Sequence, residues 1–107
     1  MALDDLLPSS RPVDFLKLDV QGAEAGALRG LRGTLAKSPR IALLCEVCPA
    51  LLAEAGADAT AFFAPLDTAG LAPHRLARDG SIARLSPEEA WSRACRSGYE
   101  NFVFRRA

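Results

Sequence analysis

Three acidic residues of this sequence, Asp19, Glu24 and Glu46, fall where the carboxyl ends of predicted strands should lie. Asp19 is near the end of an apolar run at residues 13–20, Glu24 begins the helix expected to follow, and Glu46 is near the end of a second apolar run at residues 41–47. Adjacent parallel strands would place Asp19 and Glu46 roughly 5 to 10 Å apart. The spacing therefore predicts a group of carboxylates at one edge of a sheet.

Carboxylates at such an edge have several possible uses. They can orient a substrate, act as a general base or bind a hard divalent cation, and open α/β sheets bind ligands beyond the carboxyl ends of their strands. Structural roles also explain two of them, because Glu24 in a first helical turn is favourable by about 0.3–1 kcal/mol without any function. Asp19 can cap the same helix. The residues alone leave both interpretations open.

The cysteine and histidine residues give weaker signals. Cys45 and Cys48 have the spacing of half a zinc site, but no second pair exists and His74 is the only histidine. A thioredoxin-like motif opens a helix, whereas these cysteines end a predicted strand. We expect no metal site and no catalytic triad around His74, and we interpret Trp91 as a core or interface residue.

A strand–helix–strand unit would position the acidic residues. Residues 13–20 are typical of a strand preceded by turn signals at residues 8–12, and Gly22 ends it. Apolar residues at helical spacing predict one amphipathic helix over residues 23–37, although Gly30 and Gly33 weaken it. The nearly continuous apolar run at residues 41–47 is typical of a strand covered on both faces. The connection is long enough to make the two strands parallel.

The rest of the chain predicts shorter and partly antiparallel elements. We expect two helices at residues 50–55 and 60–69, a hairpin of strands 71–77 and 81–85 around the turn at 78–80, a helix that Ser86 and Pro87 start and that runs to 96, and a last strand at 99–105. All of this fits one α/β domain spanning residues 1–107.

Composition excludes several classes of protein. Thirteen basic residues balance thirteen acidic ones, so no surface for nucleic acid is expected. The N-terminus has no basic segment followed by an apolar run, and no stretch approaches the length of a membrane span. We therefore expect no membrane partner, a cytoplasmic location and three reduced cysteines.

One motif narrows the interpretation. Residues 17–24, Lys-Leu-Asp-Val-Gln-Gly-Ala-Glu, precede a Leu-Arg-Gly triplet at residues 28–30 and a Glu-Val pair at residues 46–47. This order, together with residues 3–6 and 101–104, closely resembles the FkbM family of methyltransferases. The resemblance extends over nearly the whole chain.

The resemblance implies a fold and a cofactor. It implies a Rossmann-like class I methyltransferase sheet of seven strands, of which this chain supplies the fourth to the seventh, that is, the C-terminal half. The cofactor would be S-adenosylmethionine, but the glycine-rich loop and the acidic residue that hold it belong to the N-terminal half. The glycines at residues 30 and 33 lie in a predicted helix and not after a strand. We therefore expect this chain alone neither to bind the cofactor nor to be active.

The resemblance also implies roles for five residues. Asp19 matches the acidic position beside the methyl-transfer centre, where it would orient an acceptor hydroxyl, and Glu24 and Glu46 match further motif positions as catalytic candidates. Lys17 and Gly22 are candidates for substrate binding. The implied reaction is O-methylation of a small molecule or sugar.

Two other interpretations remain open at this point. The chain can be a non-catalytic α/β module for binding or oligomerisation. Residues 14–19 also resemble a strand of the EAL phosphodiesterase barrel, but the residues that follow are wrong for that family, and 107 residues cannot close such a barrel.

The missing half has a consequence for association. Without a preceding strand, residues 13–20 would have one side unpaired, and an unpaired strand edge invites pairing with another chain. We expect either self-association through residues 13–20 or pairing with a separate N-terminal methyltransferase lobe.

Overall fold

The computed structural model describes residues 3–6 and 12–106 of the chain, so most of the predicted turn at residues 8–12 lies outside the described residues. The strands are β1 (Phe15–Leu18), β2 (Ala42–Val47), β3 (Ala72–Leu76), β4 (Ile82–Arg84) and β5 (Glu100–Arg105). The helices are η1 (Leu3–Leu6, a single 3-10 turn), α1 (Glu24–Arg29), α2 (Arg32–Ala36), α3 (Pro49–Glu54), α4 (Ala59–Thr68) and α5 (Pro87–Ser97).

One mixed sheet organises the molecule, with its strands in the order β1-β2-β5-β3-β4. β1 and β2 are parallel, and Phe15 lies opposite Ala42 and Leu18 opposite Cys45. The other neighbours, β2 with β5, β5 with β3 and β3 with β4, are antiparallel. The predicted parallel unit and the antiparallel end are both confirmed.

The predicted first strand is too long. β1 comprises only residues 15–18. It ends at Leu18 because the chain turns soon afterwards: the N–H of Ala23 donates to the carbonyl of Val20, and Gln21 has a φ of 52°. Residues 19 and 20 therefore continue beyond the strand and belong to the connection. Asp19 keeps its position directly after the strand.

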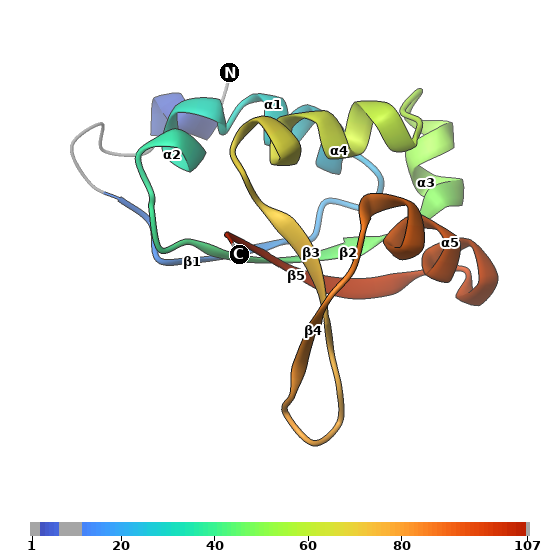
Figure 1. Ribbon diagram of the computed structural model, residues 1–107. Coiled ribbons are helices and arrows are strands. Elements are labelled where there is room, and N and C mark those ends of the chain that lie inside the picture. The colour runs from blue at the N-terminus through green and yellow to red at the C-terminus, as the bar shows by residue number, and fades with distance from the viewer. Residues whose placement is uncertain (1–2, 7–11, 107) are drawn as a thin grey trace.

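The helices lie on one face of the sheet, and the β3–β4 hairpin projects away from them (Figure 1). Alternate residues of β2 show the two faces, since Leu43, Cys45 and Val47 are buried in the core, whereas Ala42 and Leu44 are only half-buried. The expectation that residues 41–47 are covered on both faces is therefore wrong for the part of the chain that the structure describes. The side chains at the positions between the core residues face outward and remain accessible.

Aromatic rings fill the space between the helices and the sheet. Phe62 of α4 meets Phe63 edge-on at 4.9 Å between ring centroids and Phe104 of β5 at 6.0 Å. Trp91 of α5 is partly buried against the same core, with its ring 6.3 Å from that of Phe63. Trp91 therefore packs at the margin of the core, which agrees with its interpretation as a core or interface residue.

The single helix predicted over residues 23–37 is wrong, because two short helices, α1 and α2, replace it. Gly30 closes α1, and the N–H of Leu31 donates to the carbonyl of Leu28, three residues back, in place of the regular fourth. The tighter turn ends the first helix. Gly30, a residue with a low helix propensity, stands at the break.

Residues distant in sequence cap both ends of α2. The carboxylate of Asp4 accepts hydrogen bonds from the N–H groups of Gly33 (2.8 Å) and Thr34 (2.9 Å) and from the Thr34 hydroxyl. At the other end, the guanidinium of Arg106 donates to the carbonyls of Leu35 (2.8 Å) and Ser38 (2.6 Å). A helix of five residues is thus held by groups from both ends of the described chain.

The predicted start of α5 is confirmed. Ser86 and Glu89 form a capping box, in which the Ser86 hydroxyl accepts from the N–H of Glu89 and the Glu89 carboxylate accepts from the N–H of Ser86. At 11 residues, α5 is the longest described helix, and no helix in the described ranges is long and apolar enough to cross a membrane.

Replacing Asp4 with Asn tests the cap of α2. The hydrogen bond from the Thr34 hydroxyl is the largest of the effects that lower the pKa of Asp4 below its ordinary value of 3.8. Its stabilisation is therefore present above the unfolded-state pKa and is lost as pH falls through the lower folded-state pKa. We expect Asp4→Asn to reduce the free energy of unfolding by about 1 kcal/mol at pH 7, and the two proteins to converge in acid.

Urea unfolding of both proteins at a series of pH values measures this. Asp5→Asn is the matched control, since Asp5 is an exposed acid in the same turn, and it should match the wild type throughout. A gap between Asp4→Asn and wild type that stays constant down to the acid limit would contradict the role of the charge.

Candidate functional site

A small hollow lies at the carboxyl ends of β1 and β2, on the face that the helices leave open. Its volume is about 150 Å³, and Lys17, Leu18, Asp19, Leu44, Glu46 and Asn101 line it. Residues of three neighbouring strands meet there because successive side chains of a strand point to opposite faces. In β2 and β5 the core residues alternate with the outward-facing ones, and the outward set includes Glu46 and Asn101.

The strand register places three polar residues in one row. Leu18 lies opposite Cys45, so the next residues along the parallel strands, Asp19 and Glu46, lie level with each other, and Glu46 lies opposite Asn101 of β5. Neighbouring strands are about 4.8 Å apart. A ligand group in the hollow would therefore meet two carboxylates and one amide, and Lys17 lies two residues before Asp19 on the same face of the sheet.

Most of the polar groups in this row are available to a ligand. In residues 3–6 and 12–106, the side chains of Glu46 and Asn101 have no hydrogen-bond partner, and that of Asp19 accepts one bond, from the amide of Gln21 at 3.1 Å. Asp19, Lys17 and Asn101 are exposed and Glu46 is half-buried. The arrangement can accept hydrogen bonds from hydroxyl groups and can donate from Lys17 and Asn101.

Two of the predicted residues lie apart from this hollow. Glu24 is only 3% exposed, and its carboxylate accepts from the N–H of Gly22 with both oxygens, at 2.9 and 3.1 Å. Gly22 has a φ of +101°, and a Cβ there would lie 2.6 Å from the carbonyl oxygen of Leu51 in α3. The pair fixes the turn that follows Asp19. The catalytic role of Glu24 and the substrate-binding role of Gly22 stay predictions.

The thiol of Cys45 is buried and feels the charges of three acidic residues. Burial raises its pKa well above the ordinary value, and the negative charges of Glu24, Glu46 and Asp19 raise it further. The thiol is therefore protonated at neutral pH and is a poor metal ligand. Among the described residues, no group of three or more histidine, cysteine or acidic side chains is placed to hold a metal ion.

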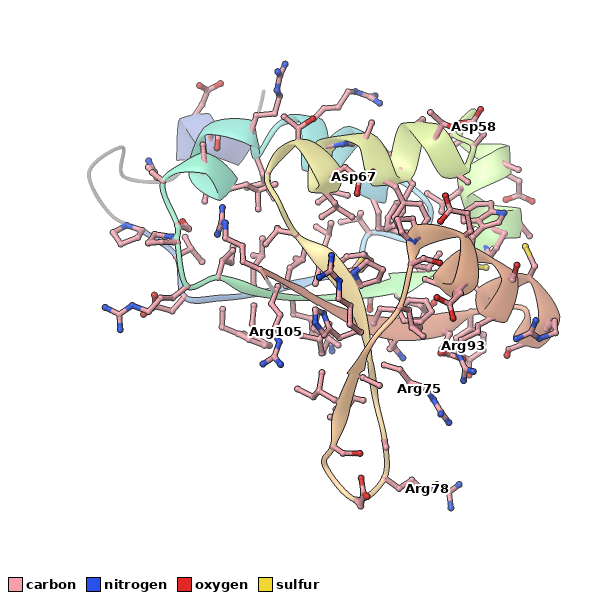
Figure 2. The ribbon with its side chains drawn as sticks, viewed as in Figure 1. Asp58, Asp67, Arg75, Arg78, Arg93 and Arg105 are labelled. Carbon is pink, nitrogen blue, oxygen red and sulfur yellow. The ribbon has the colours of Figure 1, made fainter. Side chains whose placement is uncertain are left out.

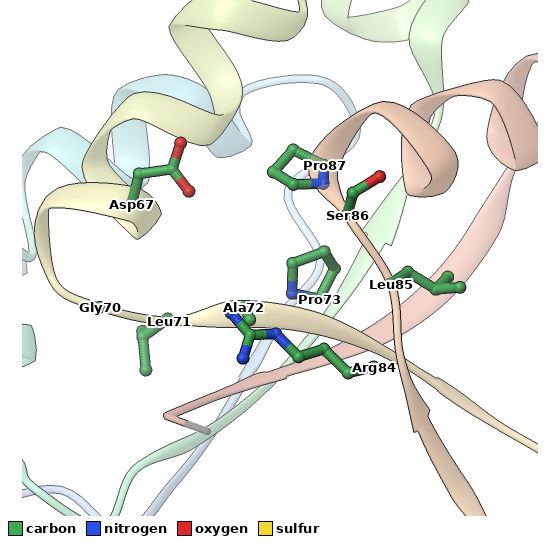
Figure 3. Close-up of a pocket in the computed structure, with 9 residues that line it drawn as sticks. All are labelled: Asp67, Gly70, Leu71, Ala72, Pro73, Arg84, Leu85, Ser86 and Pro87. Atoms are coloured by element: carbon green, nitrogen blue, oxygen red, sulfur yellow. The ribbon is translucent and has the colours of Figure 1, made fainter.

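A larger cavity, of about 520 Å³, lies between the end of α4, β3 and the start of α5. Figure 3 shows its two charged side chains, Asp67 and Arg84, among small and apolar neighbours. Both are exposed, and none of the five predicted residues lines this cavity. The smaller hollow is the better candidate because several polar groups converge there.

The charged residues elsewhere are spread over the surface. Figure 2 shows Asp58 and Asp67 on the helical side and Arg75, Arg78 and Arg105 around the sheet and hairpin. Arg93 forms an ion pair with Glu100 at 2.9 Å. The absence of a nucleic-acid partner stays a prediction.

A parallel strand–helix–strand unit with helices packed on a mixed sheet defines an α/β protein, and in open α/β sheets ligands bind beyond the carboxyl ends of the strands. Comparison with known families identifies the group within this class: the model of the methyltransferase FkbM domain matches residues 1–77 of the 107-residue chain. The chain belongs to this family, and the predicted resemblance is confirmed. No curated protein and no solved structure matched the chain.

The family match includes all five predicted site residues and ends just after β3. Asn101 lies beyond it, in β5. Sequence reasoning used residues 101–104 for the resemblance but gave Asn101 no role in the site. The signal that would have found it is the antiparallel register that pairs Asn101 with Glu46, and a register between strands so distant in sequence cannot be derived from local patterns.

Substituting the two glutamates separates structural from site roles. Glu24→Ala removes the acceptor of a buried N–H group, so we expect it to cost about 1–3 kcal/mol in the free energy of unfolding. Glu46→Ala, the matched control, removes a carboxylate without a protein partner and should change stability by less than about 0.5 kcal/mol. Chemical denaturation of both variants measures this, and equal losses would contradict the assignment.

Proposed function

We propose that this chain forms the acceptor-binding side of an FkbM-type methyltransferase site that transfers a methyl group to an oxygen of a small molecule or sugar. The observation that carries the proposal is the hollow at the carboxyl ends of β1 and β2, where Lys17, Asp19 and Glu46 converge. These residues all lie within the part of the chain that matches the family.

The chemistry of the hollow suits a hydroxylated acceptor. The carboxylates of Asp19 and Glu46 accept hydrogen bonds from hydroxyl groups, and a carboxylate beside a reacting hydroxyl can take up its proton. Lys17 donates to an oxygen of the same acceptor. A volume of about 150 Å³ admits a small part of a ligand, such as neighbouring hydroxyl groups, and not a whole large molecule.

The cofactor does not fit this hollow. Binding sites for ligands of cofactor size are roughly 300–1,000 Å³ in volume and enclose most of the ligand, whereas the hollow is about 150 Å³ and open to one side of the sheet. This hollow therefore does not hold S-adenosylmethionine, the methyl donor that the family implies, and we propose that a further segment binds it. We place that segment next to β1, whose outer side is unpaired among the described strands, as in the C-terminal half of a Rossmann-like methyltransferase sheet.

The alternative, a non-catalytic binding or oligomerisation module, is not favoured, because the family match points to a methyltransferase domain. The proposal keeps a cytoplasmic location. The three cysteines are free and Cys95 is exposed, which suits a reducing compartment.

Calorimetry with S-adenosylmethionine tests whether this chain binds only the acceptor and a further segment binds the cofactor. The chain alone is expected to show no affinity in the micromolar range, because one side of a site cannot enclose the ligand. The same chain joined to the cofactor-binding half of an FkbM-family protein should bind. Micromolar binding by the chain alone would contradict this proposal.

Asp19→Asn tests the acceptor site in that joined protein. Loss of a carboxylate that takes up the acceptor proton should lower the rate of methyl transfer about 100-fold or more, without loss of cofactor affinity. Asp14→Asn is the matched control, an exposed acid next to β1, and should keep full turnover. If Asp19→Asn retains turnover within a few-fold of wild type, Asp19 is only a surface acid.

A further inference from the structure

The outer edge of β1 is one of the two free edges of the sheet in the described chain, and β4 forms the other. β1 stands at the end of the strand order and pairs only with β2. The carbonyl of Asp14 accepts from the N–H of Ala42, and the backbone groups of successive residues point to opposite sides of a strand. The N–H and C=O groups of Phe15 and Lys17 therefore point away from the sheet, and those of Asp19 would do so if pairing extended the strand by one residue.

We propose that a second copy of this chain pairs with this edge in antiparallel orientation, so that Lys17 of each copy lies opposite Asp19 of the other. The outward backbone groups of these two residues would then complete each other's hydrogen bonds, as in an antiparallel pair that exchanges both N–H···O bonds. The two sheets would continue as one.

The two faces of the sheet limit the possible registers. Lys17 lies on the open face and Leu18 is buried in the core. Residues that pair across two strands have their side chains on the same face. The helices of both copies therefore lie on the same face of the joined sheet only when odd-numbered residues pair with odd-numbered ones. Three such registers overlap β1 well. They place Lys17 opposite the second copy's Lys17, Phe15 or Asp19.

Charge selects among these three registers. Lys17 opposite Lys17 brings like charges together, which is destabilising. Lys17 opposite Phe15 leaves Asp14 facing the apolar Leu18 on the core side. The register that places Lys17 opposite Asp19 forms two opposite-charge pairs, because the two copies are related by symmetry. Among the described residues, neither Lys17 nor Asp19 forms an ion pair within its own chain.

Apolar residues on the other face also match in this register. Leu18 lies opposite Leu18 of the second copy, and Leu16 lies opposite Val20. Val20 is 41% exposed in the single chain, so pairing would cover apolar surface. The ladder ends at Gln21, whose φ of 52° turns the chain away, and so short a ladder predicts an association that depends on concentration.

This inference does not rest on the proposed function, because it uses only the edge and its charges. The two are nevertheless connected, since a cofactor-binding segment would occupy the same edge. The second copy and that segment would therefore exclude each other, and the self-paired form is the state expected of the chain on its own.

Charge reversal tests both the dimer and its register. In Lys17→Glu, each copy brings Glu opposite Asp19, and in Asp19→Lys each brings Lys opposite Lys17, so each variant alone should dimerise about tenfold more weakly or worse. A mixture of the two variants restores both opposite-charge pairs. Sedimentation of the wild type, each variant and the mixture over a wide concentration range measures the dissociation constants.

We expect a wild-type dimer, weak homodimers of the single variants, and a heterodimer in the mixture about as tight as wild type. Formation of the heterodimer also shows that both variants fold. Arg78→Glu, at the exposed tip of the hairpin, is the control charge reversal and should dimerise normally. A wild-type chain that stays monomeric at the highest concentrations, or a mixture no tighter than its components, would overturn the proposal.

Discussion

The contact between the Glu24 carboxylate and the N–H of Gly22 is the constraint on which the candidate site depends. It joins the end of β1 to the beginning of α1 within a single turn. Glu24 is also in the first turn of a helix, where the peptide dipoles favour a negative charge. Because a side chain at Gly22 would strike the backbone of α3, the same turn fixes where that helix packs. Asp19 lies between the end of β1 and this turn. Its position therefore depends on the contacts of Glu24 and Gly22, although Asp19 itself takes no part in them.

Local patterns predicted most of the secondary structure and the pairing of the first two strands. Apolar runs separated by turn residues predicted the position of every described strand to within a few residues. They also predicted the start of α5. The grouping of Lys17, Asp19 and Glu46 also follows from the sequence, since it needs only the knowledge that parallel strands end at the same edge. Glu24 shows the limit of that argument, because a carboxylate close in sequence to the edge can still face the opposite side of the sheet.

What could not be predicted depends on contacts between distant residues. Asp4 and Arg106, near opposite ends of the described chain, form hydrogen bonds to the two ends of α2. The sequence of the helix itself contains no pattern that predicts these contacts. These hydrogen bonds explain why a short segment of low helix propensity, which contains Gly33, is helical after the break at Gly30. Asn101 reaches the hollow only through the register of β5 on β2. The half-buried Ala42 and Leu44 have the composition of covered positions although no described helix lies over them, so apolar character alone overstates burial.

The place of β5 in the sheet has a consequence for how the protein is made. This strand is the last of the described strands in chain order, yet it lies between β2 and β3 and pairs with both. During synthesis β2 and β3 emerge from the ribosome before β5, so their inner edges stay unpaired until β5 has left the tunnel. Pairings this distant in sequence are slow to form. The sheet of the nascent chain therefore stays incomplete until β5 emerges, and in that state molecular chaperones, or neighbouring nascent chains on the same message, have access to those edges.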